Sequence, residues 1–350
     1  MDLEQARAEF APTVTYLNTA TMGLPPRSTM AALDLTLQGW RDGTVEGQSF
    51  DTTIARGREL FATLVGVPAE CVAIGHQASP FVGLVATTVP DGAEVLTVKR
   101  EFTSVTFPFL AQAERGVRVR EVEPERLVDE ISESTYLVAV AAVQSRDGRV
   151  ADLDALAEAC AATGTRSLVD LTQAAGWLPV QADRFDWTVT SAYKWLLAPR
   201  GSAFLTVRPE RMLETVPHSA GWYAGEERWE SIYGLPLRLA SDARRFDISP
   251  AWQVWVGTVA SLELLLDVGT DELHRHAVGL TNRFRDAAGL PPSDSAIVSL
   301  AADGEVPALL DRHRIKAASR AGRLRLSFHV SNDAADADLA AEVLRGHVSA

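Results

Sequence analysis

Apolar strand-like runs alternate with helical patterns over the first two thirds of the chain. Short apolar runs predict strands at 71–74, 95–98, 117–122, 136–143, 167–169, 185–190 and 202–207. Apolar residues at helical spacing predict helices at 54–65, from 80 onward, near 107–115 and at 153–163. Strands separated by helices are typical of a mainly parallel sheet that is covered on both faces. The pattern therefore predicts a doubly wound α/β domain.

The pattern changes after residue 208. Residues 215–250 are rich in Trp, Gly, Tyr and Arg but weakly periodic, which favours an ordered functional loop region. Beyond it we expect helices at 252–268, 272–287 and 335–344 and short strands at 296–300 and 323–328. We therefore predict a large domain at 17–274 and a small α+β domain made of residues 1–16 and 275–350.

Composition and charge narrow the class of protein. Of the 350 residues, 47% are apolar and 23% charged, which is ordinary for a globular protein, and the longest uncharged window contains His76 and Pro80, which makes it a poor membrane span. The net charge of −13 argues against a nucleic-acid partner. Cys71 and Cys160 form no disulfide framework and lack metal-ligand spacing, and the acidic start is unlike a secretory signal. We expect a cytoplasmic protein with no metal, nucleic-acid or membrane partner.

Candidate chemistry lies where the predicted strands end. Lys194 stands between two strands, and a buried lysine whose pKa is lowered is the usual nucleophile that traps a carbonyl. A solvated loop lysine is the alternative. Asp170 ends the strand at 167–169, where a partly desolvated carboxylate needs a cationic or N–H partner. A plain ion pair between Asp170 and Lys194 is the simpler interpretation of both.

Two further strand ends change that picture. The turn at 75–80 is small and polar and opens a helix, so its free N–H groups and the helix dipole can cradle a phosphate, although an ordinary helix cap is the simpler alternative. Phe102 follows the next strand and is interpreted first as core packing and second as a stacking face. A lysine, a carboxylate, a phosphate cradle and an aromatic face are what pyridoxal phosphate requires, because the carboxylate keeps the pyridine nitrogen protonated while the lysine forms the imine. The sequence therefore predicts pyridoxal phosphate as cofactor.

With these motifs the chain resembles the class V aminotransferase family of fold type I enzymes, the group that includes cysteine desulfurases, kynureninase, isopenicillin N epimerase and hercynylcysteine sulfoxide lyases. The resemblance extends from Tyr16 to the last helix and is most specific in the segments 169–174 (VDLTQA) and 191–194 (SAYK). It implies the fold of the pyridoxal-phosphate-dependent transferases, with a mainly parallel seven-stranded sheet and a small α+β C-terminal domain. It also implies a homodimer whose small-molecule substrate is an amino acid.

The resemblance implies a role for each matching residue. Lys194 would be the Schiff-base lysine, Asp170 the partner of the pyridine nitrogen and Gln173 a hydrogen-bond donor to the ring hydroxyl. The other cofactor contacts would be the phosphate turn of Gln77, Ala78 and Ser79, the phosphate ligand Ser191, the adjacent Tyr193, the stacking residue Phe102, and Ser249, which would reach the phosphate of the neighbouring subunit. Arg325 would clamp the substrate carboxylate, since a guanidinium binds a carboxylate bidentately.

One departure from the family bears on the reaction. Cysteine desulfurases carry a nucleophilic cysteine shortly before the clamping arginine, and residues 301–324 contain none. We therefore expect an enzyme that acts at Cα of an amino acid by transamination, with Lys194 as the general base. The alternatives are C–S β-elimination from a cysteine S-conjugate or sulfoxide, amino-acid epimerisation and, outside enzymes, a catalytically silent homologue that only binds pyridoxal phosphate.

Overall fold

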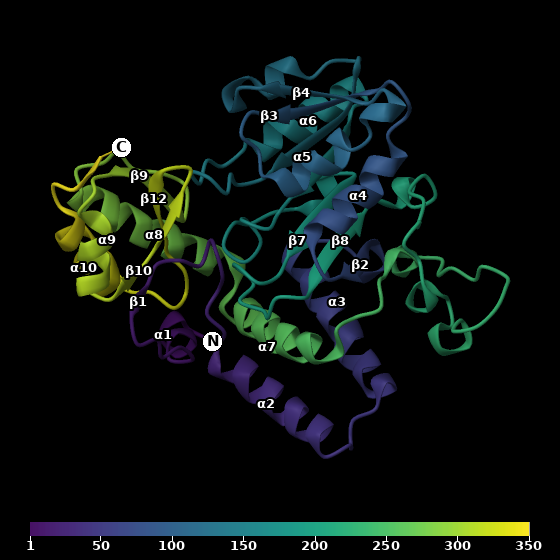
Figure 1. The fold of residues 1–350 in the computed structure, drawn as a ribbon, viewed down its shortest axis with the longest axis horizontal. Helices are drawn as coiled ribbons and strands as arrows, with labels where there is room; N and C mark the ends of the chain where they lie inside the picture. The colour runs from purple at the N-terminus through teal and green to yellow at the C-terminus, as the bar shows by residue number, and fades with distance from the viewer. Residues whose placement is uncertain (350) are drawn as a thin grey trace.

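A seven-stranded sheet forms the centre of the computed structural model, which describes residues 1–349 (Figure 1). The strand at Ala203–Val207, β8, is antiparallel to both of its neighbours, and every other neighbouring pair of strands in this sheet is parallel. The order of strands is β2 (Val72–Gly75), β8 (Ala203–Val207), β7 (Trp187–Ser191), β6 (Arg166–Asp170), β5 (Thr135–Ala141), β3 (Glu94–Val98) and β4 (Arg118–Val122). The predicted α/β fold with a mainly parallel seven-stranded sheet is confirmed.

Helices cover both faces of this sheet, because successive strand residues point to opposite sides. In β5, Val138 and Val140 belong to one buried apolar cluster, whereas Leu137 and Ala139 belong to another. The first cluster includes residues from α3 (Asp51–Val65), α6 (Leu153–Thr163) and α7 (Trp252–Val268), and the second includes residues from α4 (Ala78–Thr88) and α5 (Thr103–Leu110).

Helix α5 differs from the sequence-based expectation of a helix near 107–115. It begins at Thr103, directly after the extended Phe102, and buries Val105 and Phe109 one turn apart. Residues 113–115 form a separate short 3₁₀ turn that ends at Gly116 with a φ of 76°. The helix therefore starts at the strand end, which brings its N-terminal residues to the edge of the sheet where the candidate site lies.

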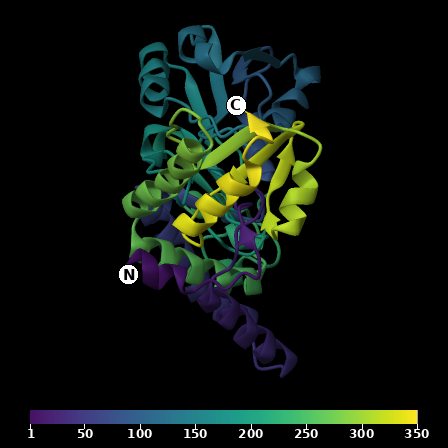
Figure 2. The same ribbon diagram turned by 90° about the vertical axis from the view of Figure 1, so that its left-hand side faces the viewer.

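The C-terminal part forms the smaller α+β domain, which lies beside the large sheet in Figures 1 and 2. Its antiparallel sheet has the order β11 (Ala318–Arg320), β12 (Arg323–Ser327), β9 (Ile297–Ala302) and β13 (Val348–Ser349). Helices α8 (Thr270–Ala287) and α10 (Ala334–Leu344) share its core. In α8, Leu273 packs in the core of the large domain while Phe284 packs in that of the small one. This change agrees with a boundary inside α8, and the limits at 1–16 and 275–350 stay a prediction.

The remaining elements lie at the edges of the two domains. Strand β1 (Thr15–Tyr16) pairs in parallel with β10 (Ile315–Lys316), and the short helices α1 (Leu3–Arg7) and α9 (Val306–Arg312) lie at the surface. Helix α2 (Arg27–Arg41) projects from the body and exposes Leu35 and Trp40 (Figure 2). Among residues 1–349, no helix has both the length and the apolar character that crossing a membrane requires.

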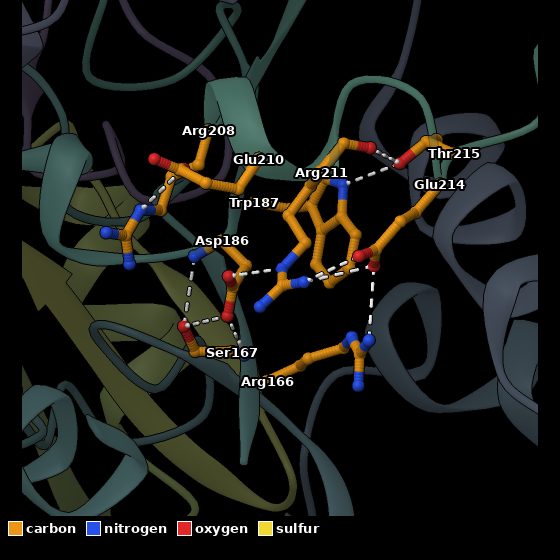
Figure 3. A network of polar contacts seen from close by, with 9 residues as sticks. All are labelled: Arg166, Ser167, Asp186, Trp187, Arg208, Glu210, Arg211, Glu214 and Thr215. Atoms are coloured by element: carbon orange, nitrogen blue, oxygen red, sulfur yellow. Dashed lines mark hydrogen bonds and ion pairs between the residues drawn. The ribbon is translucent and has the colours of Figure 1, made fainter. Parts of the chain in front are cut away.

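Arginines and carboxylates pair at the amino ends of β6 and β7 (Figure 3). Asp186 accepts hydrogen bonds from the backbone N–H of Ser167 at 2.9 Å and from Nε of Arg211 at 2.7 Å. Glu214 binds both Arg211, at 2.9 Å, and Arg166, at 3.1 Å. The protein itself thus neutralises Arg166 and Arg211 at this end of the sheet.

Candidate active site

A cavity lies at the carboxyl ends of the parallel strands, the edge at which doubly wound proteins bind their ligands. It collects most of the residues that the sequence singled out, although they come from distant parts of the chain. The predicted residues that line it are Gln77, Ala78, Ser79, Phe102, Asp170, Gln173, Ser191, Tyr193 and Lys194. Arg325 and Ser249 do not line it.

Lys194 stands in the turn that follows β7, with its side chain directed to this cavity. The residue is 5% exposed, and no residue in the range 1–349 forms a hydrogen bond or ion pair with Nζ, which lies 5.4 Å from the ring centroid of Phe102. The solvated-loop interpretation of Lys194 is therefore wrong. The direct ion pair with Asp170 is also absent from this part of the chain, so the ammonium group is buried without a bonded counterion.

The turn around Lys194 is fixed by two residues that the sequence analysis did not select. Gly23 donates its N–H to the carbonyl of Tyr193 at 2.9 Å, and a Cβ on Gly23 would lie 2.1 Å from the carbonyl oxygen of Lys194. His329 donates from Nε2 to the carbonyl of Trp195 at 2.9 Å, and burial lowers the pKa of His329 to about 4, which keeps it neutral. Both contacts hold the backbone so that Lys194 has little freedom to leave the cavity.

Burial determines the proton affinity of Lys194. Desolvation lowers the pKa of Lys194 to about 8, with smaller contributions from Arg325, Arg320 and Arg200, while Asp170 acts in the opposite direction. About a tenth of the Lys194 side chains are therefore the neutral amine at pH 7, and this is the form that attacks a carbonyl.

Uptake of pyridoxal phosphate by the apoprotein should accelerate with pH and level off above about pH 8. Because only the neutral amine of Lys194 reacts, each pH unit below the pKa of about 8 should slow uptake about tenfold. Stopped-flow absorbance measures this rate, and replacing the exposed Lys99 by alanine should leave the profile unchanged. A rate that does not vary between about pH 6 and pH 8 would contradict the low pKa of Lys194.

Asp170 ends β6 and is buried at 6% exposure. One carboxylate oxygen accepts the N–H of Thr172 at 2.8 Å, and the other has no hydrogen-bond partner among residues 1–349. Burial raises the pKa of Asp170, while the hydrogen bonds from Thr172 and the charge of Lys194 lower it. A buried carboxylate with a free oxygen facing the cavity fits the protonated nitrogen of a pyridine ring.

The start of α4 offers groups that can bind an anion. Helix α4 has no side-chain cap, and the N–H of Ala78 donates to Oγ of Ser191 at 3.0 Å. Ser79 lines the cavity beside them, and Arg200, which the sequence analysis did not select, lies 5.1 Å from the ring of Tyr193. Free N–H groups, the positive end of a helix, a hydroxyl and a guanidinium suit a phosphate.

Gln173 and Phe102 lie in the cavity under different constraints. The amide nitrogen of Gln173 already donates to the carbonyl of Ala20 at 2.9 Å and to Oγ of Ser145 at 3.1 Å. A hydrogen bond to a ring hydroxyl would have to replace one of these, so that role stays a prediction. Phe102 is 45% exposed, so its interpretation as core packing is wrong, because the aromatic side chain borders the cavity instead of the apolar core.

Arg325 lies just behind the cavity wall. It is 2% exposed on β12, donates from Nη2 to Oγ1 of Thr21 at 2.8 Å and from Nη1 to the carbonyl of Ser145, and has no carboxylate partner among residues 1–349. Burial lowers the pKa of Arg325 to about 10, with a smaller contribution from Arg320. Ser145, which Arg325 contacts, lines the cavity, so the role of Arg325 as a carboxylate clamp stays a prediction that the contacts favour.

The last two groups of residues lie away from the cavity. Ser249 is exposed in the loop after the 3₁₀ turn Ala243–Phe246, and a contact with a neighbouring subunit stays a prediction. Cys71 and Cys160 are free and buried, and burial raises the pKa of both thiols, that of Cys160 to about 12. Neither thiol lines the cavity, and these are the two cysteines of the chain. The residues present thus fit pyridoxal phosphate but offer no thiolate nucleophile.

Comparison with known proteins places this geometry in a family context. The family model described as Aminotransferase class-V matches residues 16–288, most of the chain. Two relatives are 28% identical to the chain: the "Uncharacterized aminotransferase YcbU" of Bacillus subtilis (strain 168), with 79% of this chain and 78% of that protein covered, and the "Isopenicillin N epimerase" of Streptomyces clavuligerus, with 81% and 77% covered.

Solved structures share the fold at lower identity. The apo cysteine desulfurase from Thermococcus onnurineus NA1 superposes with a TM-score of 0.85 at 21% identity, covering 97% of this chain and 96% of that chain. A complex of the cystine C-S lyase C-DES with its reaction product cysteine persulfide gives a TM-score of 0.86 at 20% identity, covering 96% and 98%. At such identities the likeness concerns the fold, and the reaction has to be argued from the residues of the cavity.

Proposed function

The chain belongs to the class V aminotransferase family of pyridoxal-phosphate-dependent enzymes, and from this premise we propose that it catalyses transamination of an amino acid. Bound pyridoxal phosphate supplies an electron sink for the charge that develops at Cα. The protein has to hold that group, bind the amino acid beside it and move one proton.

The holding residues are proposed from their contacts. Asp170 would keep the ring nitrogen protonated through its free oxygen, and Phe102 would cover one face of the ring. The start of α4, Ser191 and Arg200 would bind the phosphate. Arg325 would hold the α-carboxylate of the substrate, because it is a buried guanidinium with no carboxylate partner among the described residues.

The proposal of transamination rests on the proton carriers in the cavity. The ionisable side chains that line it are Asp170, Tyr193, Lys194 and Arg200, and desolvation lowers the pKa of Lys194 to about 8. Burial raises the pKa of Tyr193, which keeps its hydroxyl protonated and makes it a weaker acid as well as a poor base. One base that takes the Cα proton and returns it to a neighbouring carbon is sufficient for transamination, whereas inversion of Cα by two groups needs a second acid. The absence of a cysteine nucleophile argues against a desulfurase.

Single-turnover product analysis tests this proposal. The holoenzyme is mixed with a panel of amino acids and cysteine S-conjugates without a keto-acid acceptor, and the products are identified by mass spectrometry. We expect a keto acid and an equal amount of pyridoxamine phosphate. Pyruvate with a released thiol would instead identify a C–S β-lyase, an inverted enantiomer would identify an epimerase, and either result would replace transamination.

We also propose that the protein is a cytoplasmic homodimer. Two free, buried cysteines suit a reducing compartment. Ser249 is exposed and lies outside its own cavity, which leaves it available to the phosphate site of a second subunit. A monomeric mass by light scattering of the holoenzyme would contradict the dimer.

A further inference from the structure

A second cavity opens beside the first. Its volume is about 600 Å³, and Phe102 and Ser145 line both cavities. Arg100, Arg146 and Arg320 line the second cavity from three separate segments of the chain. A ligand that reacts at Lys194 can therefore extend past Phe102 into a space that three arginine residues line.

These three arginines lack carboxylate partners within the described residues. The side chains of Arg100 and Arg146 have no hydrogen bond or ion pair with any residue from 1 to 349, and Arg320 donates only to the carbonyl of Ser319 at 3.0 Å and to Oγ1 of Thr21 at 3.2 Å. Arg166 and Arg211 at the other end of the sheet differ, because both bind carboxylates there (Figure 3). In a chain with a net charge of −13, three cations without carboxylate partners around one cavity require an explanation.

The one carboxylate that borders this cavity is directed elsewhere. Glu101 is 7% exposed and accepts the N–H of Phe102 at 2.6 Å, the N–H of Ala141 at 2.9 Å and the amide of Gln144 at 2.7 Å. Burial raises the pKa of Glu101, although these three bonds lower it. Glu101 therefore anchors the backbone under Phe102 and does not neutralise the three arginines.

The rim of the cavity is held in an uncommon backbone conformation. Arg100 has a φ of 63° and Ala321 a φ of 50°, so two residues with side chains adopt the left-handed region at this rim. Such conformations cost energy and persist where surrounding structure enforces them, often at ligand sites. The backbone conformation of Arg100 thus belongs to the fold of this rim, and its exposed side chain starts from a fixed point beside the cavity.

We propose that the amino-acid substrate carries a second anionic group at the end of its side chain, and that Arg100, Arg146 and Arg320 bind this group in the second cavity. The inference rests on the proposed function, since it places the reacting Cα at Lys194. Arg325 would hold the α-carboxylate behind Ser145, which leaves the other three guanidiniums for the distal group. Guanidinium groups bind carboxylate, sulfonate and phosphate oxygens by the same charge-assisted hydrogen bonds.

Binding of matched ligands to the holoenzyme tests the anion site. The ligands are 2-methyl-L-glutamate and 2-methyl-L-glutamine, which have nearly the same shape, differ in charge and have no Cα proton to lose. We expect calorimetry to show that the glutamate derivative binds at least about tenfold more tightly than the glutamine derivative. The preference should fall as sodium chloride is added, because salt screens exposed charges. (S)-2-Amino-2-methyl-4-phosphonobutanoate, which also has no Cα proton and carries a phosphonate at the same place, tells which anion binds more tightly.

Variants then assign the preference to the three arginines. Combined replacement R100Q, R146Q and R320Q should reduce the glutamate-to-glutamine ratio to about one, whereas R118Q, at an exposed arginine on the opposite end of the sheet, should keep it. Equal binding of both ligands by the wild-type holoenzyme, with the cofactor absorbance responding to both, would overturn the anion site. If no amino acid perturbs the cofactor absorbance, the proposed function fails instead. If the triple variant does not fold, the wild type alone tests the anion site. Its preference for the glutamate derivative should then fall as sodium chloride is added, and a preference that does not change would overturn the proposal.

Discussion

Replacement of Lys194 by alanine should abolish the absorbance shift of bound pyridoxal phosphate and lower turnover about 10⁴-fold or more. Lys194 supplies the one amine in the cavity, and no described neighbour could substitute for it, since the other cation lining that cavity is Arg200. Absorbance spectra and product formation measure both effects. A matched control is Lys99→Ala, because Lys99 is exposed and pairs with Glu123. Turnover within tenfold of the wild type would contradict the role of Lys194.

The same variant should make the apoprotein more stable below about pH 8. The pKa of Lys194 falls from 10.5 to about 8 on folding, so the native state holds fewer protons than the unfolded state between these values. The free energy of unfolding of the wild type therefore rises as the pH rises from about 8 to 10.5. Below pH 8 the buried charge of Lys194 lowers that free energy by the full amount, about 3 kcal/mol. In Lys194→Ala this pH-dependent gain should disappear. Urea unfolding of both apoproteins at several pH values measures this gain. The same dependence of the free energy of unfolding on pH in the wild type and in Lys194→Ala would contradict the prediction.

Elements with complete local signals could be predicted from the sequence. Helix α6 has the expected bounds, because Asp152 caps its start by accepting the N–H of Ala155 and Gly164 ends it with a φ of 70°. The next strand, predicted at 167–169, has a local signal in Leu168 and Val169, which directly precede Asp170. In both cases the decisive residues are neighbours in the chain, so the pattern contains the information.

The orientation of β8 and the shortest elements carry weaker signals. No helix separates β7 from β8, so the connection through residues 192–202 permits an antiparallel pairing, which apolar runs alone do not specify. Helix α9 has seven residues and β10 has two, which is too short for a hydrophobic period to emerge. Neither was expected from the sequence.

The cavity residues that the sequence analysis did not select depend on contacts between distant segments. Gly23 matters because its backbone approaches Lys194, and His329 because it reaches the carbonyl of Trp195 from the small domain. Arg200 had a weak signal in its position before Gly201, close to the lysine. The second cavity had none, since Arg100, Arg146 and Arg320 come together only when both domains are folded. Sequence motifs identified the cofactor chemistry, and tertiary packing determines the space around it.

The buried ion pair between Arg58 and Asp247 should be the polar contact whose loss destabilises the fold most. Nη2 of Arg58 lies 2.6 Å from Asp247, with side-chain exposures of 6% and 0%, and Asp247 also accepts the N–H of Ile74 at 2.8 Å. The pair thereby joins α3, β2 and the segment that carries Ser249. Because Asp247→Asn would leave the arginine buried without a counterion, we expect it to lower the free energy of unfolding by about 3–5 kcal/mol.

Urea unfolding at one fixed protein concentration measures this loss, since a dimer makes stability depend on concentration. The control is Asp91→Asn, which breaks an exposed pair with Arg115 and should cost less than about 1 kcal/mol. The double variant Arg58→Met, Asp247→Leu removes both charges and should be more stable than Asp247→Asn, because no unpaired charge stays buried. If the double variant is less stable than Asp247→Asn, charge neutralisation does not account for the contribution of this pair. The hydrogen bonds to Ile74 and Val72 would then account for it.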